Sequence, residues 1–524
     1  GINIPTGKDS LSMTQTYSDG TRVLSPGTVI ISAAGNVADI RKTVGPVLAT
    51  GTDSTLYYID FSSDSLRLGG SALMQSLGSV GSDVPTVRDP EAFARAFAAV
   101  QKLVAAGRLS AIHDVSAGGL IVTLLEMTFA NTGGGLKFYT DGFRHYGEND
   151  LVKILFAENP AVVIQVSDAD KKAAEAVLDA AGVKYFPIAC PDTARTIQVT
   201  HDEKQLLLGI DTLRDVWYRP SYDLDCLQSG SKAAAERFAN YKHQPVVYNI
   251  PKSFRGDFAS AGLTADRRKR SGVRAAIIRE KGVNGDREMA YSLYLAGFNV
   301  KDVHMTDLMS GRETLDDVNM IVFCGGFSNS DVLGSAKGWA SGFVWNEKAR
   351  ATLDKFFARP DTLSLGVCNG CQLMVELGLI KPKDADALPA EMKHNRSGKF
   401  ESAFLGLTVT DSPSVMLSPL AGMKLGIWVA HGEGRFDLHG PSTGFNVAAR
   451  YTYRSYPGNP NGSPAGVAAI CSSDGRHLAL MPHLERALFP WQCAWYPASR
   501  RNDDFTPWLM AFVNARRWVE EHKK

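Results

Sequence analysis

The chain has 524 residues, more than one hydrophobic core usually supports, so we expect two or three domains. With 44% hydrophobic and 21% charged residues, the composition is that of an ordinary globular protein and excludes extensive disorder. The 56 basic and 55 acidic side chains give a net charge of +1, so neither nucleic acid nor an anionic membrane is an expected partner. No apolar run approaches the ~20 residues of a membrane span.

Seven cysteines, an odd number scattered along a long chain, argue against a disulfide framework. They favour a reducing compartment, and we expect a cytoplasmic protein. The first residue is Gly1 instead of Met, and neither a basic region nor an apolar signal core follows it. We therefore expect the chain to begin inside a larger protein.

The opening residues, GINIPTGKDS, look like a phosphate-binding P-loop. That motif has four residues between its glycines, and Ser or Thr after the Lys. Here Gly1 and Gly7 enclose five residues, and Asp9 follows Lys8. The next residues, LSMTQTYSDGTRV, read as extended chain and turn, whereas a P-loop leads into a helix. Spacing, chemistry and context therefore all reject the P-loop.

The region up to about residue 212 mixes strand and helix patterns without a strict βαβ rhythm, which predicts an α+β fold. The expected strands are 23–34, 55–61 and 161–166, and the expected helices are 90–106, 120–130 and 171–181. The pattern then loosens, so residues 213–270 read as a linker. It should hold one short helix at 231–241 and the basic run DRRKR at 266–270, which we interpret as a solvated face.

From residue 273 the rhythm changes to a regular alternation of strands and helices. The expected strands are 273–280, 320–324 and 363–367, and the expected helices are 285–297 and 349–358. This alternation predicts an α/β domain with a parallel sheet and helices on its faces.

The stretch LSLGVCNGCQLMVELG, residues 363–378, predicts a nucleophile. Cys368 directly follows an apolar strand and precedes a helix, with Gly366 and Gly370 on either side. A sharp strand-to-helix turn of this kind exposes its central residue. The helix N-terminus stabilises a thiolate, and backbone N–H groups there can hold an oxyanion.

The pair Cys368-x-x-Cys371 has two other interpretations, a redox pair and half of a zinc site. Zinc is disfavoured because the sequence has neither a second CxxC nor a nearby His pair. Cys371, one turn into the helix, is expected to pack in the core.

A nucleophilic thiol needs a base, and the base needs an orienting group. His483 and Glu485 follow the strand-like HLALM. In an extended segment, side chains two residues apart project from the same face, so the two could pair. An H-x-E pair by itself carries little weight.

Taken together in the order Cys, His, Glu, these motifs resemble class I (triad) glutamine amidotransferases, which carry G-x-C-x-G-x-Q and, far downstream, H-x-E. The resemblance implies an α/β domain with a mixed, mainly parallel sheet. It implies that Cys368 attacks the glutamine side-chain amide, that His483 moves the protons, and that Glu485 holds His483. The family usually has Pro where Leu484 stands.

The same resemblance implies further contacts with the substrate. It assigns the oxyanion hole to the backbone of Gly325, Gly326 and Asn369, and a glutamine contact to Gln372. Considered alone, a Gly-Gly pair after a strand is usually a turn.

Other stretches indicate which kind of glutamine amidotransferase the chain resembles. GGFSNSDVLGSAKGWA (325–340), HNRSGKFES (394–402) and WVAHGEGRF (428–436) resemble the glutaminase domain of large-type phosphoribosylformylglycinamidine synthases, from about residue 272 to the C-terminus. LRLGGSAL (66–73) and AIHDVSAGGLIVTLLEM (111–127) resemble the aminoimidazole-ribonucleotide-synthetase-like fold that this family duplicates. The opening residues then resemble the G-K-D-S-x-S-M segment of the second repeat.

This second resemblance implies an auxiliary nucleotide site in which Asp114 is a Mg²⁺ ligand and Ser116 contacts the nucleotide. The alternative for HDVS is an Asp cap on a glycine-rich turn. The implied domains are a remnant of the repeat's N-terminal subdomain (1–52), its C-terminal subdomain (53–212), the linker (213–270) and the amidotransferase domain (271–524).

The implied activity is the ATP-driven conversion of formylglycinamide ribonucleotide to formylglycinamidine ribonucleotide, with ammonia from glutamine. ATP/ADP and Mg²⁺ are the implied ligands, and a missing N-terminal synthetase half is the implied partner. Two alternatives stay open: a glutaminase or thiol hydrolase serving a different reaction, and an inactive fragment that acts as an interaction module.

Overall fold

The computed structural model describes residues 14–24, 31–264 and 272–523. The chain divides into two compact units, residues 1–43 and 44–524. Lys8, Ser10 and the basic run at 266–270 lie outside the described residues. None of the helices in the described ranges is both long and apolar enough to cross a bilayer.

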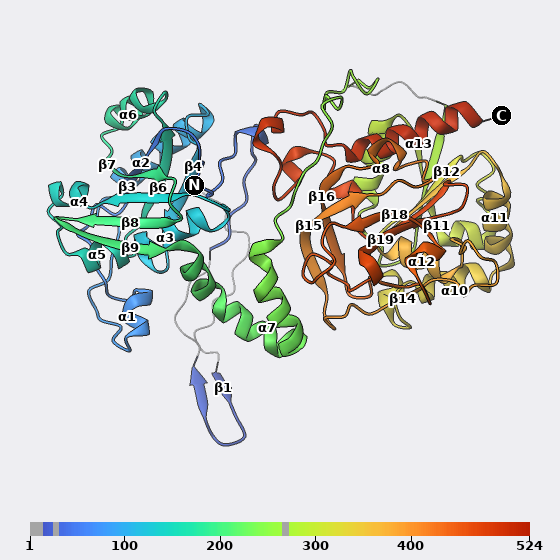
Figure 1. Cartoon of the computed structure of the whole chain (residues 1–524), viewed down its shortest axis with the longest axis horizontal. Helices are drawn as coiled ribbons and strands as arrows, with labels where there is room; N and C mark the ends of the chain where they lie inside the picture. The colour runs from blue at the N-terminus through green and yellow to red at the C-terminus, as the bar shows by residue number, and fades with distance from the viewer. Residues whose placement is uncertain (1–13, 25–30, 265–271, 524) are drawn as a thin grey trace. The chain divides into compact units, whose positions relative to one another are not determined.

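In the first unit, β1 (Thr14–Thr16) and β2 (Arg22–Leu24) form an antiparallel hairpin (Figure 1). The sequence predicted a strand over residues 23–34, but β2 ends at Leu24. The prediction was wrong for the described residues 31–34, which pair with no strand. Ile31 is 85% exposed. Its apolar side chain therefore has no sheet face to bury, and a β-rich sequence alone does not form a strand.

The second unit begins with a sheet of order β4-β6-β3-β7-β5-β8-β9, antiparallel except for the β5–β8 pair. Its strands are β3 (Ser54–Asp60), β4 (Ala111–Val115), β5 (Gly135–Tyr139), β6 (Ala161–Ser167), β7 (Tyr185–Asp192), β8 (Thr196–His201) and β9 (Lys204–Gly209). Successive side chains of β3 face opposite sides: Tyr58 joins one core and Tyr57 the other.

Helices cover both faces of this sheet. α3 (Gly119–Phe129) and α5 (Leu151–Phe156) pack on the side of Tyr58, and α2 (Pro90–Ala105) and α6 (Lys171–Ala180) on the side of Tyr57. Two shorter helices are α1 (Ala72–Ser76) and α4 (Asp141–His145). The α+β prediction is confirmed, as are the strands and helices expected between residues 55 and 181.

Helix α7 (Ile210–Asn240) has 31 residues and is kinked at Gly230, where φ is 77°. The prediction of loose chain from 213 with only a short helix was therefore wrong. Pro220 lies inside the helix. A proline usually ends a helix because it has no backbone N–H to donate to the preceding turn. The first half of α7 packs on α3, where the rings of Phe129 and Trp217 lie 5.3 Å apart.

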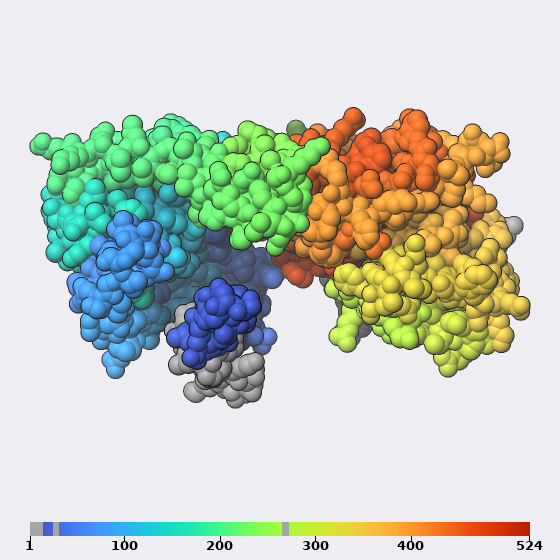
Figure 2. Space-filling view, turned by 90° about the horizontal axis from the view of Figure 1, so that it is seen from below, coloured from blue at the N-terminus to red at the C-terminus, as the bar shows by residue number. Residues whose placement is uncertain are grey.

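The second half of α7 contacts the C-terminal part of the chain. Arg237 Nη2 donates to Glu401 Oε2 at 3.0 Å, and Arg396 Nη2 to Glu236 Oε2 at 2.6 Å. In Figure 2 the green surface of α7 lies against orange residues of that part. The helix therefore takes part in the packing of two sheets.

The C-terminal sheet has the order β11-β10-β12-β13-β20-β19-β18-β15-β16. Its strands are β10 (Arg274–Arg279), β11 (Asn299–His304), β12 (Met320–Phe323), β13 (Leu363–Val367), β15 (Glu401–Val409), β16 (Lys424–His431), β18 (Asn446–Tyr451), β19 (Val467–Cys471) and β20 (His477–Leu480). The strands from β11 to β20 are parallel and the rest antiparallel. A separate ribbon pairs β14 (Glu391–Lys393) with β17 (Arg435–Asp437).

In the described residues from 272 to 523, six helices flank the C-terminal sheet. They are α8 (Asp286–Ala296), α9 (Met305–Ser310), α10 (Lys337–Val344), α11 (Glu347–Ala358), α12 (Asn369–Glu376) and α13 (Trp508–His522). In Figure 1, α8 and α13 pack together on one side, and α10, α11 and α12 on the other. The predicted α/β domain with a mixed sheet is confirmed.

Candidate active site

The three segments predicted to react follow three neighbouring strands. β12, β13 and β20 are adjacent and parallel, so their carboxyl ends meet at one edge. Gly325 and Gly326 follow β12, Cys368 follows β13, and His483 follows β20. The carboxyl edge of a parallel sheet is where ligands bind in α/β folds.

Cys368 forms the predicted elbow. Its backbone is left-handed, with φ 52° and ψ −105°, and α12 begins at the next residue. Such a strained conformation persists only where the surroundings enforce it. A Cβ on Gly366 would lie 2.4 Å from the carbonyl oxygen of Gly370, and a Cβ on Gly370 would lie 2.0 Å from the carbonyl oxygen of Phe323. Both glycines are therefore required for the turn.

His483 and Glu485 pair in the buried interior. His483 Nδ1 and Glu485 Oε1 are 2.6 Å apart. The backbone N–H of His483 donates to the carbonyl of Trp428 at 2.8 Å, which fixes the segment to β16. The predicted pairing is found, but its expected geometry was wrong: residues 484–486 form a 3₁₀ turn. Leu484, at the position where the resemblance suggests Pro, is fully buried in that turn.

The charge state of His483 is set by its neighbours. Burial by itself lowers the pKa of His483, but the Glu485 carboxylate and Cys368 outweigh it and raise the pKa to about 10. His483 Nε2 is buried and has no hydrogen-bond acceptor in the described part of the chain. The arrangement therefore favours an imidazolium beside Cys368, held in place through Nδ1.

The glycine pair after β12 lies against the reacting groups. A Cβ on Gly325 would lie 2.8 Å from His483 Cε1 and 3.3 Å from Cys368 Cβ. Phe327 N–H is occupied by the carbonyl of Gly282, at 2.8 Å. Within the described ranges, the N–H groups of Gly325 and Gly326 donate to no protein acceptor. These donors, with Asn369 N–H at the start of α12, are available to an oxyanion.

A cavity of about 220 Å³ opens beside Cys368. Its wall includes Asp331, Gln372, Lys399, His431 and Glu433. Burial lowers the pKa of His431 to about 4, so this imidazole is neutral. Of these five residues only Gln372 was singled out from the sequence. The others lie in or beside stretches that were recognised only as family segments.

Gln372 lines the cavity, but both polar atoms of its side chain are used by the protein. Its Oε1 accepts from Asn369 Nδ2 at 3.0 Å, and its Nε2 donates to the carbonyl of Glu433 at 2.8 Å. The side chain of Asn369 in turn accepts the N–H of Ser328 at 3.2 Å. Gln372 thus ties α12 to the loop after β16 and shapes the cavity wall.

Cys371 is not part of the reacting set. It is fully buried, all seven cysteines are free, and burial raises the pKa of its thiol well above the ordinary value. Within the described ranges, no group of three or more His, Cys, Asp or Glu residues could hold a metal ion. The prediction that Cys371 packs in the core is confirmed.

Asp114 is an exposed residue near the end of β4, and Ser116 is exposed in the turn between β4 and α3. The cap of α3 is Gly118, with no side-chain hydrogen bond, so Asp114 is not a helix cap. The Asp114 side chain is 71% exposed and lies 3.3 Å from His113 Nδ1. The turn itself is held by Glu158, whose Oε1 accepts the N–H of Gly118 at 2.8 Å.

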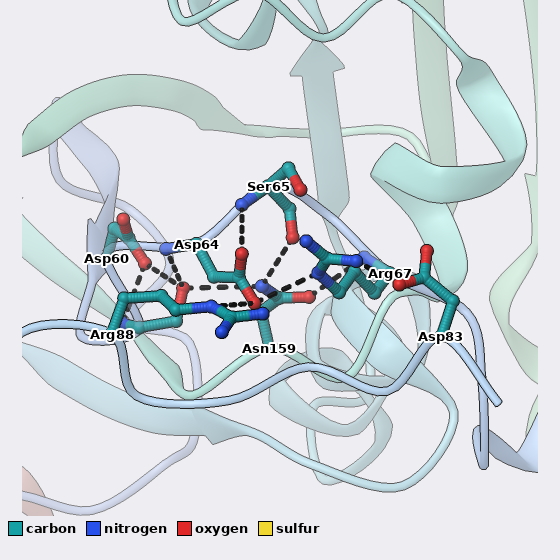
Figure 3. Close-up of polar contacts among 8 residues, drawn as sticks. Asp60, Asp64, Ser65, Arg67, Asp83, Arg88 and Asn159 are labelled. Carbon is teal, nitrogen blue, oxygen red and sulfur yellow. Dashed lines mark hydrogen bonds and ion pairs between the residues drawn. The ribbon is translucent and has the colours of Figure 1, made fainter.

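Paired charges and hydrogen bonds hold the start of the LRLGGSAL segment (Figure 3). Asp64 Oδ2 accepts from Arg67 Nε at 3.0 Å and lies 3.3 Å from Arg88 Nε. The buried Asn159 accepts the N–H of Arg67 at 3.1 Å and donates to the carbonyl of Ser65 at 3.0 Å. Because these charges are satisfied within the protein, the cluster fixes the loop.

Two parts of the chain match known family models. Residues 272–519 match the family model of the CobB/CobQ-like glutamine amidotransferase domain. Residues 53–189 match that of the C-terminal domain of AIR synthase related proteins. The chain therefore carries a glutamine amidotransferase domain behind an AIR-synthase-related domain.

Over almost its whole length, the chain is similar to proteins named phosphoribosylformylglycinamidine synthase. It is 40% identical over 547 residues to the probable chloroplastic/mitochondrial enzyme of that name from Arabidopsis thaliana, covering 99% of this chain and 38% of the relative. It is 39% identical to the human protein of that name, and the match covers 99% of this chain and 40% of the human protein. The chain thus spans about two fifths of the length of these relatives. The structure of PurLQS from Thermotoga maritima is 26% identical and covers 48% of this chain and 100% of that one, with a TM-score of 0.37.

Proposed function

We propose that this chain hydrolyses glutamine with Cys368, His483 and Glu485 as the reacting triad. The observation that carries the proposal is the convergence of these residues at one sheet edge, with His483 Nδ1 2.6 Å from Glu485 Oε1. The elbow conformation of Cys368 and the adjacent cavity support it. Thiol, base and orienting carboxylate are the parts that nucleophilic amide hydrolysis needs.

In the proposed reaction the Cys368 thiolate attacks the amide carbon of glutamine, and a carbon–sulfur bond forms. The N–H groups of Gly325, Gly326 and Asn369 would hold the oxyanion. The His483 imidazolium gives its proton to the leaving nitrogen, and ammonia departs. Water then attacks the thioester while His483 takes up a proton, which returns glutamate and the thiolate.

The ammonia would serve the synthesis of formylglycinamidine ribonucleotide. In this reaction ATP, formylglycinamide ribonucleotide, glutamine and water give formylglycinamidine ribonucleotide, ADP, phosphate and glutamate. The names of the relatives support this assignment, and the rest of a relative-sized protein would supply most of the synthetase. We assign the chain to the cytoplasm, consistent with its seven free cysteines.

We also propose that Asp114, near the end of β4, and Ser116, in the turn after it, contact a nucleotide and its Mg²⁺. Mg²⁺ commonly takes one or two protein carboxylates together with phosphate oxygens and water, and the exposed Asp114 carboxylate fits such a shared role. The ion would neutralise phosphate charge. We keep the proposed domain limits at 1–52, 53–212, 213–270 and 271–524.

The test uses Cys368→Ala in the full-length protein. Glutamine hydrolysis and glutamine-dependent synthesis should both be lost, whereas synthesis with added ammonium salt should continue. Glutaminase activity that survives in Cys368→Ala would refute the role of the thiol. Loss of ammonia-dependent synthesis would show that the substitution damages more than the glutaminase.

A further inference from the structure

Two carboxylates face the cavity beside Cys368 and have no assigned role. Asp331 comes from the short turn Ser328–Asp331 after β12, and Glu433 from the loop after β16. Ser335 joins them: its hydroxyl donates to Asp331 Oδ2 at 3.4 Å, and its N–H donates to Glu433 Oε2 at 3.4 Å. Segments about 100 residues apart therefore bring two negative charges to one wall.

The backbone that presents Asp331 is strained. Asn329, Ser330 and Asp331 are consecutive non-glycine residues in the left-handed region, with φ of 51°, 57° and 50°. Each such residue costs about 1–3 kcal/mol, so a run of three persists only where the surroundings enforce it. The N–H of Asn329 is anchored to the carbonyl of Lys281 at 2.8 Å. Strained backbone of this kind is most common at functional sites, where it holds a side chain such as that of Asp331 in a fixed direction.

Within the described residues, the basic side chains that line this cavity form no ion pair with Asp331. Lys399 Nζ donates to Asp225 Oδ1 at 2.6 Å, and His431 is neutral. His394 is 81% exposed, and its Nδ1 lies 4.0 Å from Glu433 Oε1.

Asp331 lacks a cationic partner in the described part of the chain, which affects both its hydrogen bonding and its pKa. Within the described residues its Oδ1 is buried and accepts no hydrogen bond. Burial, with the nearby charge of Glu433, raises the pKa of Asp331. A cationic ligand group in the cavity would relieve both effects.

We infer that the Asp331–Glu433 pair receives the α-ammonium group of glutamine and selects an α-amino acid over other primary amides. The inference rests on the proposed function, because it needs glutamine in this cavity. The α-ammonium lies at the opposite end of the glutamine molecule from the amide that Cys368 attacks. Cys368 and the two carboxylates line the same cavity, so one bound glutamine molecule can contact all three.

The test measures alkylation of Cys368 by two chloroketones that differ only in the α-amino group. They are 2-amino-5-chloro-4-oxopentanoate, which mimics glutamine, and 5-chloro-4-oxopentanoate, which lacks the amine. In each case the thiolate displaces chloride and a carbon–sulfur bond forms, so labelling needs no turnover. Mass spectrometry of the intact chain gives the two rates.

In the wild type the amino reagent should label Cys368 about 10- to 100-fold faster, the range expected from one charge-assisted contact. Asp331→Asn and Glu433→Gln should each bring the ratio of rates toward one, mainly by slowing the amino reagent. The matched control is Asp354→Asn, which removes an exposed carboxylate paired with Arg350 on α11 and should keep the wild-type ratio.

The outcomes separate the two proposals. Equal labelling of wild-type Cys368 by both reagents overturns the inference and leaves the thiol chemistry intact. Wild-type selectivity retained in both Asp331→Asn and Glu433→Gln overturns it as well. A wild-type Cys368 that neither reagent labels refutes the proposed function itself. Because the two carboxylates lie on different segments, Glu433→Gln decides the question if Asp331→Asn does not fold.

Discussion

His483 Nδ1 lies 2.6 Å from Glu485 Oε1, and both side chains are only 2% exposed. A charged hydrogen bond in such a dry environment is stronger than the same bond at the surface. Glu485 thus fixes both the orientation of the imidazole and the nitrogen that carries its inner proton. The other imidazole nitrogen is left for the thiol.

Replacing Glu485 with Gln should lower the rate of glutamine hydrolysis by up to about 10,000-fold, the loss expected when the orienting carboxylate of a catalytic triad becomes an amide. The amide preserves the shape but removes the charge that holds the imidazolium. Ammonia release at saturating glutamine measures the effect. A variant that retains a third or more of the wild-type rate would contradict the role assigned to this carboxylate.

The same pair predicts a pH dependence of stability. The pKa of His483 rises from its ordinary 6.5 to about 10 on folding. Its contribution to the free energy of unfolding is therefore complete below about pH 6.5 and is lost as the pH rises toward 10. Urea unfolding of wild type and Glu485→Gln at pH 6, 8 and 9.5 should give a difference that shrinks with pH. A difference that stays constant or grows would refute the assignment.

Gly370→Ala should disable the elbow. The new Cβ would lie 2.0 Å from the carbonyl oxygen of Phe323, so the backbone must shift. Overpacking of this kind costs about 1–3 kcal/mol and should also misplace Cys368. Thermal unfolding and Cys368 alkylation measure the two effects. The control is Gly444→Ala, where a Cβ would meet nothing within 4 Å and no change is expected.

Asp225→Ala should destabilise the contact between α7 and the C-terminal part of the chain. Asp225 is 7% exposed and accepts from Lys399 Nζ at 2.6 Å. Removing one partner of a buried ion pair costs about 3–5 kcal/mol. The matched control on the same helix is Asp223→Ala, whose exposed pair with Arg219 is worth about 0–1 kcal/mol. Equal losses for the two variants in denaturant unfolding would contradict this prediction.

Cys371→Ala should leave glutamine hydrolysis within about twofold of wild type. The thiol is buried, free and held in its neutral form by burial, so it has no part in the reaction. A redox or zinc role for the pair would instead make activity depend on both cysteines. Activity assays with and without reductant and chelator distinguish the two.

Much of the fold could be predicted because its strands and helices have simple periodic patterns. The apolar strand 363–367 and the glycines around Cys368 predicted the elbow, and the structure confirms it. Helix α7 could not be predicted, since Pro220 and Gly230 interrupt its pattern and packing on α3 and on Glu401 compensates. Residues 31–34 show the converse, a strand-like sequence that has no partner.

The site was only partly visible in the sequence. Cys368, His483 and Glu485 lie within recognisable motifs, although the pairing of His483 with Glu485 depends on a 3₁₀ turn instead of an extended segment. Asp331 and Glu433 carry no local signal, because about 100 residues separate them and only the fold brings both to one wall. Gln372 was expected to contact glutamine, but a motif does not reveal that both of its polar atoms are used by the protein.

Both the parallel and the antiparallel half of the C-terminal sheet contribute to the site. Its parallel half carries the nucleophile and the base on β13 and β20, while residues 378–476 between them form the antiparallel half and contribute Lys399, His431 and Glu433 to the cavity. That same insertion supplies Glu401 to α7. Substitutions in this segment can therefore change the cavity wall or the contact with α7 while the pairing of β13 with β20 still places Cys368 beside His483. The position of the triad thus depends on the two strands β13 and β20 and not on the segment between them.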